Sequence, residues 1–420
     1  MDIIKIDDFP SEIKENQIFE IIPDKSKIVP YTNRLFNKYP TRYISAVPRY
    51  AIQNFSKKND FVLDPFCGSG TTAIEALVNC RNAISIDIDP FARLLIKTKT
   101  AFYTNTDIKK IEDVVNTLKK LTPNTLFETP EIPDINKWFC EQSVIELSFL
   151  KHYIDLLTEE NPKVRDYFYV VFASIIRKCS NADDVSPKPY ISTRFKKIPK
   201  IPFELFFKNE ELYRPAIIEF SNRIADFNCD SILLDSNDAK NVNYSGTVDL
   251  AVTSPPYINA YDYVRSLKFE DVWLGLADLE TLRKNRKNYV GSEVKNENII
   301  NYQFIKNSNT LIDKLNIMEN LDKKRKIVIS NYFEDMAYNI MSVRSALKKD
   351  GYYVLVVGDS TIRNINIPTG KILSEIAQKI GFNHELSFKY VIRDRYMHLP
   401  RGNNGGIIKY DEILVLRKAE

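Results

Sequence analysis

Short apolar runs alternate with amphipathic segments in the first quarter of the chain. Residues 61–63 form an apolar run, residues 73–78 a helical pattern, and residues 83–87 a second apolar run. Further helical patterns cover residues 43–55 and 92–99. A strand, a helix and a strand in this order favour a parallel, doubly wound α/β sheet.

Similar apolar runs return in the second half of the chain. The pattern predicts seven strands in all, at 61–63, 83–87, 231–234, 248–252, 352–357, 386–392 and 412–416. We expect the last two to pair as a terminal hairpin. Helical patterns at 328–348 and 372–380 lie on either side of the strand at 352–357.

The alternation stops near residue 101, and the chain to residue 228 is mostly helical in pattern. Helices are expected there at 108–121, 144–157 and 164–178. Residues 1–30 predict an irregular lead-in. We therefore divide the chain into core segments at 1–100, 229–275 and 336–420, a helical insertion at 101–228 and a second insertion at 276–335.

Composition indicates a well-buried globular protein. The chain has 420 residues, 44% of them hydrophobic, which suits one large or two ordinary domains. It has no apolar run of about 18 residues and no signal-peptide pattern, so we expect a cytoplasmic protein without membrane association. Five scattered cysteines and three histidines do not favour a metal site. The net charge of +4 decides little, because binding to nucleic acid needs a basic face and not a basic total.

A glycine-containing turn follows the first predicted strand, in Asp64-Pro-Phe-Cys-Gly-Ser-Gly-Thr-Thr72. Glycines let the backbone approach a ligand, and a helix N-terminus opens beside them. The second strand ends at Asp87, where a carboxylate can accept hydrogen bonds from ribose hydroxyls. The turn lacks the Gly-Lys-Ser/Thr ending of a P-loop and the third glycine of a dinucleotide fingerprint, since position 73 is Ala73. An acid at its start favours a cationic or amino-bearing ligand over a pyrophosphate.

A second motif, Thr253-Ser-Pro-Pro-Tyr257, follows the apolar run at 248–252. Each proline lacks an N–H and fixes its own φ, so the chain leaves the sheet by one stiff path. The Ser254 hydroxyl, carbonyls without ladder partners and the Tyr257 ring then form a receptor for a flat, amine-bearing group. Taken alone, the motif is also typical of an ordinary proline-rich turn.

Together the two motifs resemble those of the S-adenosylmethionine-dependent amino-methyltransferases that modify exocyclic NH2 groups of DNA bases. Residues 64–71 look like that family's cofactor loop and residues 254–257 like its catalytic loop. Residues 35–44 are similar to its segment that closes over the methionine end of the cofactor. The resemblance covers roughly residues 31–100, 226–275 and 340–420. It implies a seven-stranded, mainly parallel Rossmann-like methyltransferase sheet, with one reversed strand at its end and a helical insertion.

The resemblance implies S-adenosylmethionine as cofactor and assigns roles to residues that match the family's motifs. An acid after the strand at 231–234 would accept from the adenine amine; Asp238 is the expected residue and Asp235 the alternative. The expected cofactor-binding residues are Tyr39, Pro40, Asp64, Phe66, Gly68, Gly70, Thr71, Asp87 and Asp238. The expected catalytic residues are Ser254, Pro255, Pro256 and Tyr257.

The target base must leave the duplex to present its amine to this loop. Hydrogen bonds from the amine to Ser254 Oγ and the Pro255 carbonyl would favour a tetrahedral, lone-pair-bearing nitrogen. In the family, serine at this position favours cytosine N4 and aspartate favours adenine N6. Serine can also donate to cytosine N3, but adenine N1 lies equally close to N6, so adenine N6 is the alternative.

Basic and aromatic residues interleave at 186–200, and residues 282–289 form a dense basic run; either segment could hold double-stranded DNA. Solvated surface is the plain alternative for both. A long Gly-rich loop at 393–406 is also expected to be functional. The expected DNA-binding residues are Lys188, Tyr190, Arg194, Lys196, Lys197, Arg283, Lys284, Arg286, Lys287 and Arg395. A cognate restriction endonuclease is the other candidate partner.

The sequence disfavours four other functions. A covalent cytosine-C5 mechanism is disfavoured because none of the five cysteines follows a proline. An RNA amino-methyltransferase shares the loop logic, but no RNA-binding module is recognisable. A catalytically silent DNA-binding subunit of a restriction complex is disfavoured by the intact pairing of both loops. A nicotinamide oxidoreductase is disfavoured by the missing third glycine and by the Pro-Pro loop.

Overall fold

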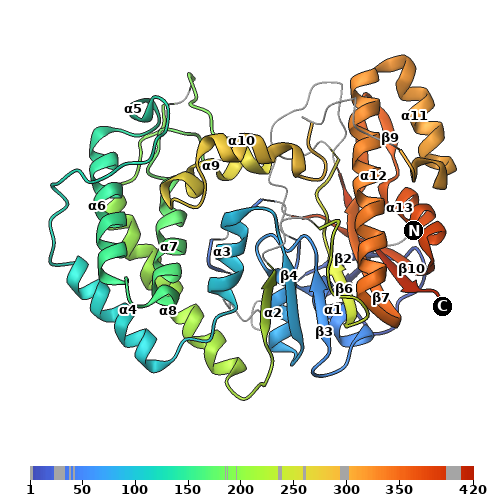
Figure 1. The fold of residues 1–420 in the computed structure, drawn as a ribbon, viewed down its shortest axis with the longest axis horizontal. Coiled ribbons are helices and arrows are strands. Elements are labelled where there is room, and N and C mark those ends of the chain that lie inside the picture. Colours follow the sequence, from blue (N-terminus) through green and yellow to red (C-terminus); the bar gives the residue numbers. More distant parts are fainter. Residues whose placement is uncertain are drawn as a thin grey trace.

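A nine-stranded sheet forms the centre of the molecule (Figure 1). The computed structural model describes residues 3–22, 34–36, 39, 40, 43–184, 186, 188–194, 196–234, 239–258, 262–293, 302–393 and 408–420. Across the sheet the strands are β1 (Ile3–Ile6), β2 (Ile18–Ile21), β10 (Phe382–Val391), β11 (Tyr410–Lys418), β7 (Leu347–Gly358), β6 (Val248–Thr253), β3 (Phe61–Asp64), β4 (Asn82–Ile86) and β5 (Ser231–Leu234). Strand β11 is antiparallel to both of its neighbours, and the other neighbouring pairs are parallel.

The fold class is the expected mainly parallel α/β sheet, and all seven predicted strands are present. The expectation for residues 1–30 was wrong, because β1 and β2 extend the sheet beyond β10. The reversed strand was expected at the end of the sheet, and this expectation was also wrong because β1 and β2 extend the sheet. Strand β11 lies inside the sheet, with β10, β2 and β1 continuing past it.

Both faces of the central strands are buried, and alternate residues enter two separate hydrophobic cores. Along β6, Leu250 and Val252 join one core and Ala251 joins the other. Along β3, Val62 and Leu63 divide in the same way. Side chains of a strand point alternately to its two faces, so a strand covered on both sides is apolar at every position. This is why these strands stand out in the sequence as continuous apolar runs.

Helices cover both faces of the sheet and form a separate group at one end of the molecule (Figure 1). Helices α1 and α2 pack on one face, and α12 and α13 on the other, with α11 beside them. The segments α4 to α10 form their own apolar core together with α3. The helices are α1 (Ala46–Phe55), α2 (Thr71–Val78), α3 (Pro90–Lys99), α4 (Asn105–Leu118), α5 (Ile135–Trp138), α6 (Glu141–Leu157), α7 (Pro162–Ile176), α8 (Pro202–Ile224), α9 (Tyr263–Trp273), α10 (Leu279–Asn285), α11 (Asn309–Leu321), α12 (Lys323–Ala346) and α13 (Thr369–Ile380).

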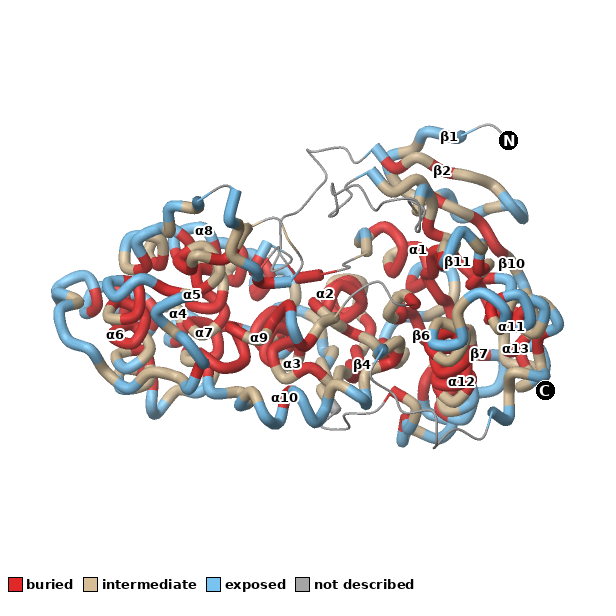
Figure 2. Tube along the Cα trace, turned by 90° about the horizontal axis from the view of Figure 1, so that it is seen from above, coloured by how far each residue is buried: buried red, intermediate tan, exposed pale blue. Residues whose placement is uncertain are grey.

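Helix α9 links this helical group to the sheet. It begins at Tyr263, five residues after Ile258 in the loop that follows β6. Its apolar side joins the core of the helical group through Leu267 and Phe269. Figure 2 shows the burial that results, with continuous buried segments through α7, α9 and α3. Within the described residues, no helix is both long and apolar enough to span a membrane.

Candidate active site

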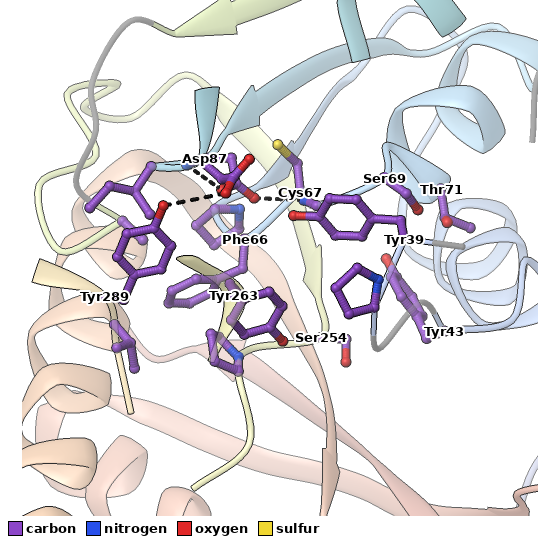
Figure 3. A pocket seen from close by; sticks show the side chains of 18 of the residues that line it. Tyr39, Tyr43, Phe66, Cys67, Ser69, Thr71, Asp87, Ser254, Tyr263 and Tyr289 are labelled. Atoms are coloured by element: carbon purple, nitrogen blue, oxygen red, sulfur yellow. Dashed lines mark hydrogen bonds between the residues drawn. The ribbon is translucent and has the colours of Figure 1, made fainter. Parts of the chain in front are cut away.

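The expected site lies where the order of the strands reverses. From β3 the chain goes to β4 and β5 on one side, then returns to β6 and β7 on the other. The loops that follow β3 and β6 therefore lead to opposite sides of the sheet. Open α/β sheets bind ligands in the crevice between two such loops. A pocket opens at this point (Figure 3). It is lined by Tyr39, Pro40, Tyr43, Pro65, Phe66, Cys67, Gly68, Ser69, Thr71, Asp87, Ile88, Asp89, Ala239, Ser254, Pro256, Tyr263, Asn288, Tyr289 and Val290.

The glycine turn requires glycine because of its close contacts and positive φ angles. Gly68 has φ +46°, and a Cβ there would lie 3.0 Å from the Tyr39 ring. Gly70 has φ +81°, and a Cβ there would lie 2.9 Å from Ile96 Cγ1 on α3. L-residues with side chains seldom adopt such angles. The turn can thus pack beneath the Tyr39 ring and begin α2 directly afterwards.

Asp87 and Asp89 place two carboxyl groups on the pocket wall after β4. Asp87 Oδ2 accepts a hydrogen bond from the Gly68 backbone N–H at 2.8 Å, and Oδ1 accepts from the Asp89 N–H at 2.9 Å. Asp89 caps α3 by accepting from the Ala92 N–H at 2.9 Å, and the Tyr289 hydroxyl lies 3.4 Å from its other oxygen. Burial raises the pKa of Asp87, although both backbone N–H groups oppose the shift. Burial and the charge of Asp87 raise the pKa of Asp89 to about 7.

Asp64 joins the two loops from below the pocket. Its carboxylate accepts hydrogen bonds from Thr253 Oγ1 at 2.6 Å, from Thr72 Oγ1 at 2.5 Å and from the Phe66 N–H at 3.1 Å. Thr253 ends β6 and Thr72 lies in the first turn of α2, so one carboxylate fixes both loops. Burial raises the pKa of Asp64 to about 6, against the effect of these hydrogen bonds. Asp64 is 1% exposed and is not among the pocket-lining residues, so its contact with a cofactor stays a prediction.

Thr71 and Ser254 each bring a hydroxyl group to the pocket wall. Thr71 Oγ1 is buried and has no hydrogen-bond partner within the described part of the chain. Ser254 is half-buried, and its side chain makes no hydrogen bond to another described residue. Buried polar atoms are nearly always paired, so the buried Thr71 hydroxyl is available to a ligand, and the half-buried Ser254 hydroxyl is accessible to one. The cofactor loop supplies one of these groups and the catalytic loop supplies the other.

The catalytic loop is held from behind by the terminal hairpin. The Tyr257 hydroxyl donates to Asp411 Oδ1 at 2.6 Å, and the Tyr390 hydroxyl donates to Asp411 Oδ2 at 2.7 Å. Burial and the charge of Asp411 hold the pKa of Tyr257 well above its usual range, so its hydroxyl stays protonated. Tyr257 is absent from the residues that line the pocket, as is the buried Pro255. Their contact with a base stays a prediction.

The lining residues fit S-adenosylmethionine. The pocket has two carboxyl groups, an unpaired buried hydroxyl at Thr71 and the aromatic rings of Tyr39, Phe66, Tyr263 and Tyr289. No Lys, Arg or His is among its described lining residues, so a phosphate-bearing cofactor would find no cation there. Acceptors and aromatic faces suit a cationic sulfonium, an ammonium, ribose hydroxyls and a flat adenine.

The Cys67 thiol also lies in this pocket, but its chemistry is unfavourable for covalent attack. Burial and the nearby charges of Asp87 and Asp64 hold the pKa of Cys67 well above its usual range. A thiol that stays protonated is a poor nucleophile. Elsewhere among the described residues, no group of three or more His, Cys, Asp or Glu is arranged to hold a metal ion.

The structure brings most of the expected cofactor residues into one pocket. Tyr39, Pro40, Phe66, Gly68, Thr71 and Asp87 line it together with Ser254 and Pro256 of the catalytic loop. Gly70 shapes the turn without lining the pocket. Asp238 lies outside the described residues, as does Arg395. Asp89 and Tyr289 line the pocket and were not assigned to it from the sequence.

The expected DNA-binding residues have different surroundings. Lys188 lines a small pocket with Tyr263, Tyr289 and Glu293, next to the main one. Tyr190, Arg194 and Lys196 are exposed. Lys197 is instead tied down: its ammonium donates to the Arg177 and Ala182 carbonyls and to Asp184. It is therefore a less suitable phosphate contact than the three exposed residues.

The second basic segment lies on α10 and the turn after it. Arg283, Lys284 and Lys287 are exposed, while Arg286 is half-buried and pairs with Asp262 at 2.5 Å. Lys284 pairs with Glu280 one helical turn away at 2.7 Å. An exposed ion pair contributes little to stability, so Lys284 can readily exchange Glu280 for another anion.

Comparison with known proteins identifies several relatives. A family model, N6_N4_Mtase, described as DNA methylase, matches residues 7–98. Type II methyltransferase M.MvaI of Kocuria varians is 26% identical over 357 residues, which cover 80% of this chain and 78% of that protein. Type II methyltransferase M.BsoBI of Geobacillus stearothermophilus is 22% identical over 398 residues, covering 82% and 77%. A solved structure, the rRNA methyltransferase aviRa from Streptomyces viridochromogenes, covers 89% of this chain and 85% of its own at 9% identity, but its TM-score of 0.30 supports no argument.

Proposed function

Because the chain belongs to the S-adenosylmethionine-dependent amino-methyltransferases of DNA, we propose that it methylates the exocyclic N4 of a cytosine at a specific site in double-stranded DNA. The proposal extends to a role in restriction and modification, with a cognate endonuclease as partner. The relatives named above are Type II methyltransferases, which supports that role.

One observation carries the proposal: the cofactor loop and the catalytic loop share a single pocket. Ser254 lines it together with Gly68, Thr71 and Asp87. The two loops come from β3 and β6, 180 or more residues apart in the chain, yet Asp64 bonds to both. A methyl donor and an amine acceptor held there would be in contact, as transfer between them requires.

Each residue has a distinct proposed task. Asp87 and Asp89 hold the ribose and the cationic part of the cofactor, and the aromatic rings enclose it. When bound, S-adenosylmethionine supplies the methyl group as an activated, positively charged electrophile. Ser254 Oγ and the Pro255 carbonyl accept hydrogen bonds from the target amine, which orients its lone pair. Tyr257 supports the loop and offers its ring to the flipped base.

The choice of cytosine N4 rests on Ser254, whose hydroxyl can accept from the amine and donate to the neighbouring N3. Its half-buried position, with no described hydrogen-bond partner, supports this task. Adenine N6 is the second candidate, because adenine presents an amine beside an unprotonated ring nitrogen in the same way. An acidic residue in place of Ser254 would have favoured adenine.

Single-molecule sequencing of genomic DNA from cells that express the protein tests the proposal, because it reports the modified base and its sequence context together. We expect N4-methylcytosine at one recurring site, absent from cells that express the Ser254→Ala variant. N6-methyladenine at a recurring site would support the alternative. Unmodified DNA, with S-adenosylmethionine binding intact in calorimetry, would instead favour a catalytically silent DNA-binding subunit.

A further inference from the structure

A second opening lies between α9, α10 and the segment that contains α5. Its volume is about 300 Å³, and its floor is apolar. The floor includes Val264 and Phe269 of α9, Leu282 of α10 and the half-exposed Trp138. The full lining is Ile132, Pro133, Trp138, Val264, Arg265, Lys268, Phe269, Leu279, Leu282, Arg283 and Arg286. We call this opening the cationic pocket.

Four positive side chains surround the cationic pocket, and none of its described lining residues is acidic. Lys268 is held over aromatic rings instead of a carboxylate: its Nζ lies 4.5 Å from the centroid of the Trp138 ring and 4.8 Å from that of Phe269. Burial and the charges of Arg265, Arg177 and Arg283 lower the pKa of Lys268. Of the four cations, Arg286 has a carboxylate partner, Asp262. Clustered cations without counter-charges attract an anion.

The cationic pocket is separated from the proposed methyl-transfer site by one small opening, whose lining includes Asp262 and Glu293. A small opening between them shares Tyr263, Tyr289 and Val290 with the cofactor pocket. It shares Val264 and Arg286 with the cationic pocket. The three openings therefore form a row along the first turns of α9. This places the cationic pocket on the same side of α9 as the proposed entry of the target base.

We propose that the cationic pocket binds one nucleotide of the DNA substrate beside the methylated base. The phosphates on either side of this nucleotide contact Arg265, Lys268 and Arg283, and its base, which also leaves the duplex stack, lies against Trp138 and the apolar floor. The apolar floor suits the flat base of a nucleotide, and the cationic rim suits its phosphate. The inference rests on the proposed function, since it takes the substrate to be DNA.

The charged part of this proposal is tested by DNA affinity at several salt concentrations. The variant R265Q/K268Q/R283Q should bind a short duplex with the target site roughly 30-fold more weakly at 0.1 M salt, and the slope of log affinity against log salt should fall by about 2 to 3. The matched control K109Q/K110Q/K120Q removes three exposed lysines of α4 and the residues just after it, away from α9 and α10 in Figures 1 and 2. It should stay close to the parent protein. Equal affinity and slope for both variants would overturn the proposal.

The base contact is tested separately with Trp138→Ala. This variant should lose about tenfold in affinity at every salt concentration while keeping the parent's slope, because stacking and not charge is removed. Unchanged affinity would refute a base in the pocket. Calorimetry with S-adenosylmethionine checks that each variant is folded. A parent protein that binds S-adenosylmethionine but neither binds nor methylates DNA would refute the proposed function itself, an outcome distinct from either failure above.

Discussion

At the scale of single residues, three aspartates near two neighbouring strand ends have separate tasks. Asp64 makes three hydrogen bonds to the chain and fixes the two loops. Both carboxylate oxygens of Asp87 accept hydrogen bonds from backbone N–H groups, and Asp87 still lines the pocket. Asp89 caps α3 and contacts Tyr289. Their protonation is governed by burial, which raises the pKa of all three.

Asp87→Ala should weaken S-adenosylmethionine binding by about ten- to a hundredfold, the range expected for a lost hydrogen bond to a charged group. Asp87→Asn is the matched control, because its amide oxygen can still accept from the Gly68 N–H while the charge is lost. We expect an intermediate affinity for it. Calorimetry provides the measurement, and an alanine variant with the parent's affinity would remove Asp87 from the cofactor site.

The affinity for S-adenosylmethionine should depend on pH through Asp89. Its pKa is raised to about 7, so the carboxyl is neutral below that pH and negative above it. The cofactor carries one more positive charge than its product S-adenosylhomocysteine. Its binding relative to the product should therefore strengthen roughly three- to tenfold between pH 6 and pH 8. Calorimetry with both ligands checks this, and Asp89→Asn should flatten the dependence; a flat profile in the parent protein would contradict it.

Residues beside a strand-end motif could be predicted to reach the pocket, and residues from elsewhere could not. Gly68, Thr71 and Ser254 follow directly after predicted strands, so the topology of the sheet places them. Tyr289 enters from the turn after α10. No periodicity or motif marks its approach, because it depends on how the helical group packs against the sheet.

At the scale of elements, the hairpin of β10 and β11 supports the catalytic loop. Tyr390 and Asp411 face each other in the hairpin register, and Asp411 pairs with Gly358 of β7 on its other side. The carboxylate therefore reaches Tyr257 from a central position in the sheet. Burial raises the pKa of Asp411, while the two tyrosine hydroxyls oppose the shift.

Asp411→Asn should slow methyl transfer by roughly ten- to a hundredfold without changing the affinity for S-adenosylmethionine. The amide offers one acceptor to two tyrosine hydroxyls, so the Tyr257 contact weakens and the loop shifts; small misplacements of reacting groups cost this much. Tyr390→Phe is the matched control, since it leaves the contact between Tyr257 and Asp411 intact and should have a smaller effect. Single-turnover kinetics decides, and a parent-like rate for Asp411→Asn would show that the hairpin does not position the loop.

The central strands and the edge strand β5 were predictable from the sequence, whereas β1 and β2 were not. Strands β3 and β6 are apolar on both faces and stand out for that reason. Strands β1 and β2 have four residues each, and β1 is mostly exposed. Their pairing depends on Ile18 and Phe19 meeting Lys389 and Tyr390, far along the chain. Only a tertiary contact fixes that register, so no local pattern indicates it.

At the scale of the whole molecule, the chain combines a sheet that holds the small ligands with a helical group that widens the surface beside them (Figure 1). Helix α9 belongs to the core of the helical group and begins close to the catalytic loop. The proposed nucleotide site lies along it. The cofactor and the nucleotide beside the target base are therefore assigned to adjoining but separate pockets, and variants of the cationic pocket should leave cofactor binding intact.

We propose that Ser254 directs methyl transfer to cytosine N4. Mass spectrometry of nucleosides, from DNA methylated in vitro by the parent protein and by Ser254→Ala, tests it most directly. We predict N4-methylcytosine from the parent and a rate at least tenfold lower from the variant, with S-adenosylmethionine affinity nearly unchanged because the hydroxyl acts on the flipped base. N6-methyladenine without N4-methylcytosine, or an undiminished rate in the variant, would contradict the claim.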